Sequence, residues 1–414
     1  MSKERLKILV LVDTFYPVVG GVSSVADQSC IALSEVADVT LGACYAKGYT
    51  DPERPYKIVR CKGYYNKITN DGMAHPEFDK NFRKMVEEGD FDLIHCHTAG
   101  NFMTYARRVS KKLDIPLVTC VHLLWHTAVK DYLKFDFLVK PVVKIFLNKI
   151  NKCDYVYTVS NFCKNALIPY GLRQDTKVMY NATSLLPNNR EQARKRVNEK
   201  YNLDENIFVM SFVSRIIKSK GIDLVIDAIN LLKNKKMNFK VFIVGDGNYL
   251  DKSLKKIKDL GLEDYFVSVG MVKDRNLLVD FYQRTDLLLF PSPCDAAGLI
   301  QVEGAGCTTP TLTIENVAQS EMMVNFKNGL VAKNNPEDYA KYIEYAYNNR
   351  EVLREIGENA YETLYKYYYD PKTIDELVSM YLDVIKKYES KRCIKREQYS
   401  FRKSKNARKC RKPC

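Results

Sequence analysis

The sequence lacks long apolar runs: no segment approaches the ~18 consecutive apolar residues that a membrane-spanning helix needs. The N-terminus has a basic start, but the apolar stretch behind it is short and ends at Asp13. We therefore interpret that stretch as the first strand of a domain and not as a signal peptide. We expect a cytoplasmic protein, and peripheral attachment to the inner face of the membrane stays open.

Motifs of several other protein classes are also missing. The 12 cysteines form no CxxC pair, which favours reduced core thiols over disulfides or metal ligands. No G-x-G-x-x-G fingerprint follows the first strand, so a nicotinamide cofactor is not indicated. Without an HExxH motif, the five histidines support a metal site less well than a single imidazole that faces a cleft. These histidines are His75, His95, His97, His122 and His126.

Short apolar strands alternate with helical patterns in both halves of the chain. Leu6–Val12 has the composition of a buried parallel strand, and a Gly20-Gly21 turn and a helical pattern follow it. After Asn181 the pattern starts again, with Phe208–Val213 as the first strand of a second set. This alternation predicts α/β domains with doubly wound parallel sheets, and 414 residues are enough for two of them. We expect two Rossmann-like domains that face each other across a cleft.

We place the N-terminal domain at 1–185 and the C-terminal domain at 186–371. A terminal helix over 372–390 is then available to pack back on the N-terminal domain. The remainder, 391–414, holds eleven basic residues and one acid, so it carries ten of the fourteen net positive charges. We expect a disordered basic tail there, which either binds an anionic membrane surface or is only a solvated end. No pattern of a specific nucleic-acid-binding module is present.

The segment from Phe290 to Pro310 is the most informative part of the chain. It has the pattern of a strand, a loop at the carboxyl end of that strand, a helix N-terminus and a second strand. Ligands bind at such positions in open α/β sheets. Asp295 lies in the loop near Gly298 and Glu303 in the helix, and both carboxylates can accept hydrogen bonds from sugar or ribose hydroxyls. The alternative is that the two acids only favour a turn and a helix N-terminus.

Two further turns at strand ends carry suitable chemistry. Arg215 and Lys220 flank the turn after the first strand of the second domain, where a guanidinium and an ammonium group suit a pyrophosphate. A solvated charged loop is the alternative there. Gly245 opens a Gly-Asp-Gly turn after the next strand, and its flexibility allows a ligand or a backbone to approach closely.

In this order, the segments resemble those of the retaining glycosyltransferases of family four, which have the GT-B fold of two facing Rossmann-like domains. The likeness extends over most of the chain and leaves the basic tail outside. Ser214–Gly221 is similar to the family's G-R-L-x-x-x-K-G, the turn at Gly245 to its G-x-G, and Asp295-x7-Glu303 to its E-x7-E.

The resemblance implies a role for each of these residues. Arg215 and Lys220 would hold the donor pyrophosphate, Glu303 the nucleoside ribose, and Asp295 the hydroxyls of the transferred sugar as a catalytic residue. Further donor contacts are implied at four glycines: Gly20, Gly21, Gly245 and Gly298.

A catalytic histidine that faces the transferred sugar is implied as well. His126 lies in His-Thr-Ala-Val-Lys-Asp-Tyr, which is similar to the H-T-x-Y-E-D-Y segment of lipid-glucosylating members. His122, which directly follows the preceding strand, is the alternative candidate for this histidine. Four positions depart from the family pattern. Asp295 stands where Glu is commoner, which leaves the donor sugar open, and Thr308 stands where Gly usually ends the helix. Ser214 and Ala182 also stand where the family has Gly. An inactive relative is the alternative that these departures leave.

The implied reaction is transfer of a hexosyl group from a nucleotide diphosphate sugar, with a UDP-sugar favoured, to a hydroxyl of a lipid or polysaccharide acceptor, with anomeric retention. A nucleotide-sugar epimerase or a sugar phosphorylase on the same fold is the alternative. The family needs no divalent metal, so we expect no cofactor. The basic amphipathic segment Lys134–Ile150 and the tail suggest an anionic membrane surface as a partner, unless that segment only covers the sheet.

Overall fold

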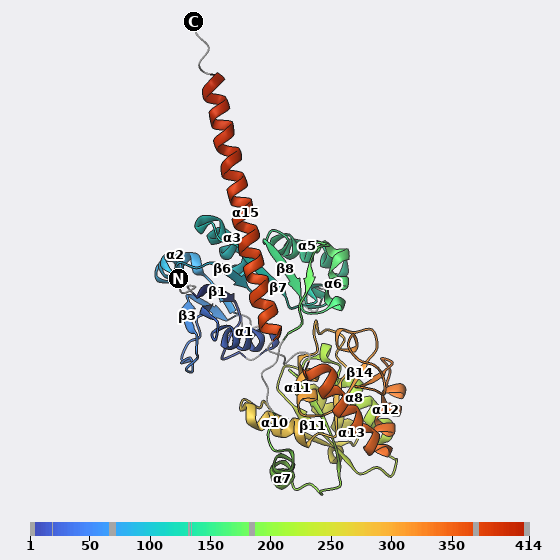
Figure 1. The fold of residues 1–414 in the computed structure, drawn as a ribbon. Helices are drawn as coiled ribbons and strands as arrows, with labels where there is room; N and C mark the ends of the chain where they lie inside the picture. The colour runs from blue at the N-terminus through green and yellow to red at the C-terminus, as the bar shows by residue number, and fades with distance from the viewer. Residues whose placement is uncertain are drawn as a thin grey trace.

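The computed structural model describes residues 5–18, 20–65, 72–130, 133, 135–181, 187–366 and 372–409. The chain forms two α/β domains and ends in a long helix (Figure 1). Each domain has a parallel sheet with helices on its faces, which confirms the predicted fold class. Among the described residues, no helix combines the length and the apolar character needed to cross a membrane.

The N-terminal domain is built on a seven-stranded sheet in the order β3-β2-β1-β6-β7-β8-β9. The order reverses between β1 and β6, so the loops after these two strands diverge and leave a crevice at their carboxyl ends. The strands are β1 (Leu6–Val12), β2 (Ala37–Cys44), β3 (Lys57–Cys61), β6 (Leu93–Cys96), β7 (Leu117–Val121), β8 (Tyr155–Thr158) and β9 (Lys177–Val178). The helices are α1 (Gly21–Leu33), α2 (Lys80–Glu88), α3 (Asn101–Leu113), α4 (Trp125–Lys130), α5 (Val139–Ile150) and α6 (Asn161–Leu167).

The polar segment between β3 and α2 also contains a short antiparallel hairpin. Its strands are β4 (Gly63–Tyr65) and β5 (Gly72–Ala74), and the residues between them lie outside the described part of the chain. His97 and His122 directly follow strands, as expected, but His95 lies within β6. It is a core residue, 1% exposed, between the hydroxyls of Tyr157 and Tyr381.

The C-terminal domain has a six-stranded sheet in the order β12-β11-β10-β13-β14-β15, which reverses between β10 and β13. The strands are β10 (Phe208–Val213), β11 (Phe239–Val244), β12 (Phe266–Gly270), β13 (Leu287–Phe290), β14 (Thr311–Ile314) and β15 (Leu330–Ala332). The helices are α7 (Arg190–Tyr201), α8 (Ile222–Leu232), α9 (Leu250–Asp259), α10 (Arg275–Arg284), α11 (Leu299–Gly306), α12 (Pro336–Asn348) and α13 (Arg350–Ala360). The helical pattern over 337–368 predicts one terminal helix there. The structure instead divides this region at Asn349 into α12 and α13, because the backbone of that residue is not helical (φ −125°, ψ 54°).

Helix α15 (Lys372–Lys409) returns from the C-terminal domain to the N-terminal one, and its far end projects beyond the body (Figure 1). Its first half packs on the N-terminal core through Leu377, Met380, Tyr381 and Val384. The sequence predicted disorder from Lys391, but in the structure the helix continues to Lys409. The change of composition at Lys391 therefore does not mark the end of the helix, and Arg392 still pairs with Asp114 of the N-terminal domain at 2.7 Å.

Candidate active site

A cavity lies between the two domains, at the carboxyl-terminal edges of both sheets. The N-terminal domain lines it with Val159, Ser160, Tyr180 and Asn181. The C-terminal domain contributes the start of α11 and the loop after β14: Ala297, Gly298, Leu299, Gln301, Val302, Ala318, Gln319 and Met322. The predicted donor segment therefore forms one wall of an interdomain cavity.

Lys220 and Asp295, two of the predicted site residues, form an ion pair. Lys220 lies in a short 3-10 turn after β10, and Asp295 lies in the loop after β13. The ammonium nitrogen donates to Asp295 Oδ1 at 2.5 Å, and the side chains are 16% and 20% exposed. Burial by itself lowers the pKa of Lys220, but the Asp295 carboxylate outweighs it and the net pKa is raised.

Asp295 keeps one oxygen for another partner. Its Oδ2 is buried and accepts no hydrogen bond from any of the described residues. Arg215, on the other side of the turn, is exposed, and its positive charge acts on Lys220. The Lys220–Asp295 pair thus has a second cation nearby and one carboxylate oxygen without a described partner, groups that can interact with negative charge and with hydroxyls.

Two of the predicted glycines are required by the local geometry. Gly245 has φ +142°, and a Cβ there would lie 1.8 Å from the carbonyl oxygen of Ser214. A Cβ on Gly298, which precedes α11, would lie 2.8 Å from Gln301 Oε1. Gly245 keeps the turns after β10 and β11 together, and Gly298 keeps the entry to α11 open along the cavity.

Glu303 lies on α11 and is buried, with 8% of its surface exposed. Its Oε2 accepts a hydrogen bond at 2.8 Å from the hydroxyl of Tyr282, a fully buried residue of α10. Burial raises the pKa of Glu303, while the Tyr282 hydroxyl and the Arg275 charge lower it. The net pKa is above its usual value, so the carboxylate is a desolvated group whose hydrogen bonds matter.

Gly20 and Gly21 lie in the N-terminal domain, at the N-terminus of α1. Both residues are exposed, and a Cβ on Gly21 would meet no atom within 4 Å. The neighbouring Tyr16 has its pKa raised to about 12, first by burial and then by Asp27, while the charge of Arg275 from the C-terminal domain opposes this. The glycine turn therefore lies open on the side that faces α10.

The two candidate histidines have different surroundings. His122 directly follows β7; its Nε2 lies 2.9 Å from His97 Nδ1, and burial lowers its pKa to about 4. His126 lies on α4 and stacks on Tyr170, and its Nδ1 is buried without a hydrogen-bond partner among the described residues. Neither ring lines the interdomain cavity directly.

Sequence reasoning missed one connection between the domains, at the N-terminus of α6. Glu321, in the loop after β14, accepts hydrogen bonds from the backbone N–H groups of Asn161 (3.1 Å) and Phe162 (2.7 Å). The hydroxyl of Tyr180 also donates to it at 2.8 Å, and Ser160 donates to the carbonyl of Ala296 at 2.6 Å. No local pattern at Glu321 indicates this contact, because its partners lie more than 140 residues away.

Comparison with known proteins identifies the family of the chain. The family described as "Glycosyltransferase Family 4" matches residues 19–185, and the family described as "Glycosyl transferases group 1" matches residues 193–363. The two matches adjoin and span most of the chain. The chain belongs to glycosyltransferase family four. This glycosyltransferase is therefore a hexosyltransferase, as its sequence predicted.

Characterised and uncharacterised relatives agree with the family. An uncharacterized glycosyltransferase of Methanocaldococcus jannaschii is 25% identical over 84% of this chain and 90% of its own length. The alpha-monoglucosyldiacylglycerol synthase of Streptococcus pneumoniae is 21% identical over 75% of this chain and 71% of its own. The structure of HepE from Anabaena, in complex with UDP and glucose, superposes with a TM-score of 0.74 at 18% identity, and covers 91% of this chain and 99% of HepE. The GT-B fold is thus confirmed.

Proposed function

We propose that this glycosyltransferase moves a hexosyl group from a nucleotide diphosphate sugar, with UDP-sugars preferred, to an acceptor hydroxyl, with retention at the anomeric carbon. The observation that carries the proposal is the Lys220–Asp295 pair at the carboxyl-terminal sheet edge, with one Asp295 oxygen still free of described partners. Neither the relatives nor the structural neighbours favour the epimerase or phosphorylase alternative.

The cleavage of the donor produces charge on the diphosphate leaving group. Lys220 and Arg215 are the cations that would stabilise this charge, because they flank one turn and the charge of Arg215 acts on Lys220. In the structure Lys220 is held by Asp295, so the ammonium group is fixed in place before a donor binds. Asp295 Oδ2 would accept a hydroxyl of the sugar, and Glu303 would accept the ribose hydroxyls. No metal is needed for charge neutralisation in this scheme.

A direct test is nucleotide release from UDP-glucose, UDP-N-acetylglucosamine, UDP-galactose and GDP-mannose, with and without membrane lipid. We expect Lys220→Ala and Glu303→Ala to abolish release from the preferred donor, and Lys218→Ala to retain it. Lys218 is a suitable control because it lies in the same turn, carries the same charge and is exposed. Wild-type turnover in both active-site variants would refute the assignment. Unchanged turnover in EDTA would support a metal-independent reaction. Loss of turnover in EDTA, followed by recovery when Mg²⁺ is added, would refute metal independence.

Either histidine could face the transferred sugar, and we propose His126 because one of its ring nitrogens is buried without a described partner. His122 shares its Nε2 with His97 and is already engaged. We expect His126→Ala to lower kcat by about a hundredfold or more, and His122→Ala to act mainly on stability. The reverse pattern in kcat and thermal unfolding would assign the role to His122.

We further propose a lipid acceptor at an anionic membrane surface. Around α5 the structure exposes Phe137 by 75% and Ile145 by 59%, while Lys140 and Lys144 are on the same helix. Exposed apolar side chains beside lysines suit the interface of an anionic bilayer. The similarity to a monoglucosyldiacylglycerol synthase supports a lipid acceptor.

The membrane surface can be tested by flotation with liposomes that contain anionic lipid. The full chain is compared with a chain that ends at Ser390 and with the Phe137→Ser/Ile145→Ser variant. Loss of flotation in the double variant alone assigns binding to α5, and loss in the truncated chain alone assigns it to the basic end of α15. Equal flotation of all three proteins would remove both segments from the proposal.

A further inference from the structure

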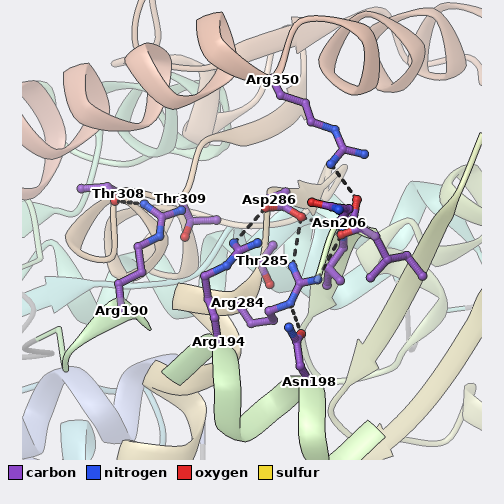
Figure 2. Close-up of polar contacts among 12 residues, drawn as sticks. Arg190, Arg194, Asn198, Asn206, Arg284, Thr285, Asp286, Thr308, Thr309 and Arg350 are labelled. Carbon is purple, nitrogen blue, oxygen red and sulfur yellow. Dashed lines mark hydrogen bonds and ion pairs between the residues drawn. The ribbon is translucent and has the colours of Figure 1, made fainter. Parts of the chain in front are cut away.

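A group of arginines with few carboxylates lies at the edge of the C-terminal sheet that is opposite the cleft (Figure 2). Asp286 immediately precedes β13, and Thr308 follows α11 and precedes β14, so both lie at the amino-terminal edge of the sheet. Helices α7 and α13 and the end of α10 place guanidinium groups around them. We call these residues the arginine cluster: Arg190, Arg194, Arg284, Arg350 and Arg354.

Both oxygens of Asp286 are already used within this cluster. Oδ1 accepts a hydrogen bond from Arg194 at 3.0 Å. Oδ2 accepts from the fully buried Arg284 at 3.1 Å and from the backbone N–H of Val209 at 2.8 Å. In the described part of the chain, no other carboxylate forms an ion pair with a member of the arginine cluster. Among the described residues, Arg190, Arg350 and Arg354 therefore have no carboxylate in an ion pair, and Arg350 donates instead to the carbonyl of Asn206.

Arg190 is the member that most clearly lacks a counter-charge. Its side chain is only partly exposed, and its guanidinium donates at 2.5 Å to the hydroxyl of Thr308, a neutral acceptor. Burial and the charge of Arg194 lower the pKa of Arg190. A partly desolvated cation is normally paired with an anion, because its lost hydration must be replaced.

Thr308 supports the interpretation independently. It adopts φ +54°, a left-handed conformation that is unfavourable for a β-branched residue. Its backbone is fixed from the other side, since a Cβ on Gly357 of α13 would lie 2.2 Å from the Thr308 carbonyl oxygen. A glycine would fit this backbone without strain, but it would lack the hydroxyl that holds Arg190. The strained threonine thus fixes the direction of one guanidinium group.

We propose that the arginine cluster binds a phosphate-type oxyanion, with Arg190 and Arg194 as the direct ligands. Guanidinium groups one helical turn apart on α7 present their N–H donors on the same side, and planar forks of this kind match the oxygens of a phosphate group. Arg350 and Arg354 add positive charge from α13. Either inorganic phosphate or the phosphate of a sugar ester would supply the same oxygens.

Such an anion would act on the donor site through α11. Thr308 lies shortly after the C-terminal end of α11, and this helix carries Glu303. An anion held by Arg190 would therefore favour the folded arrangement of the donor wall. Because the binding site itself lies outside the cleft, binding can be measured without assuming any reaction.

The test is thermal unfolding of the full chain, followed by far-UV circular dichroism, in sodium phosphate, in glucose 6-phosphate and in sodium chloride of matched ionic strength. We expect a saturable rise in Tm with phosphate or its ester that chloride does not reproduce. In Arg190→Gln the concentration that gives half of this rise should increase by roughly tenfold to a hundredfold, as for loss of a hydrogen bond to a charged group. A stronger response to glucose 6-phosphate than to inorganic phosphate would assign the ester as the ligand.

Three further variants distinguish the arginine cluster from the donor site and from a general effect of surface charge. Lys195→Gln changes the same charge on an exposed position of α7 and should keep the response, whereas Thr308→Gly should weaken it although it relieves backbone strain. Lys220→Ala should keep the response to phosphate, because the donor site is separate from the arginine cluster. Loss of the response in Lys220→Ala but not in Arg190→Gln would overturn the proposal, as would equal responses to phosphate and chloride.

Discussion

The hydroxyl of Tyr282 is a sharp test of how the donor wall is stabilised. It donates at 2.8 Å to a carboxylate oxygen of Glu303, and both side chains are buried. Tyr282→Phe removes this donor without changing the shape of the side chain. A hydrogen bond to a buried charge contributes about 1.5–3 kcal/mol, so we expect the free energy of unfolding at neutral pH to fall by about 2 kcal/mol.

The pH dependence of this loss has a defined sign. The pKa of Glu303 is raised above its ordinary value of 4.5, so the folded state binds more protons than the unfolded state in the range just above that value. Stability from this group therefore falls as the pH rises through that range. The Tyr282 hydroxyl lowers the pKa of Glu303, so its removal raises that pKa further and extends the fall to higher pH.

Urea unfolding followed by far-UV circular dichroism, at pH values near 4.5 and near 7, measures this difference. The deficit of Tyr282→Phe relative to the wild type should be larger near pH 7, and the KM for the donor should rise while the protein stays folded. Tyr265→Phe, which loses a hydrogen bond to the neutral carbonyl of Lys233, is a control that should show no such pH dependence. An equal deficit at both pH values would show that the hydroxyl does not act through the Glu303 charge.

Three other changes test the remaining contacts. Glu321→Gln should weaken the hydrogen bonds that join the domains at α6, and small-angle X-ray scattering should then show a larger radius of gyration; no change would argue against a clamp. Gly245→Ala should cost more than about 2 kcal/mol, because its Cβ would lie 1.8 Å from the Ser214 carbonyl oxygen, and thermal unfolding measures this. Tyr381→Phe loses the 2.7 Å contact with His95 and should lower the free energy of unfolding of the N-terminal domain by about 1 kcal/mol. Unfolding is followed by the fluorescence of the single tryptophan, and an unchanged unfolding midpoint would contradict an anchoring role for α15.

The chain's local pattern was sufficient for much of the fold. Buried strands such as Leu6–Val12 and Phe208–Val213 are nearly continuous apolar runs, as expected for strands covered on both faces. The break at Asn349 was not predicted, because the residues on both sides of it have helical periodicity and a single residue with non-helical backbone separates them. The continuation of α15 beyond Ser390 was missed for the opposite reason: charged composition suggests disorder, but it does not prevent a helix.

By itself, the sequence determined two α/β domains, the glycine turns at the strand ends and the residue types of the donor segment. These features depend on short-range periodicity and on backbone conformations that only some residues adopt. Only the tertiary structure decided that Lys220 and Asp295, 75 residues apart, form one ion pair. It also decided that Tyr282 supports Glu303, that Glu321 joins the domains and that Arg190 has no carboxylate partner in the described chain. These are contacts between side chains from different elements, and their distances depend on how the sheets and helices pack rather than on any local pattern.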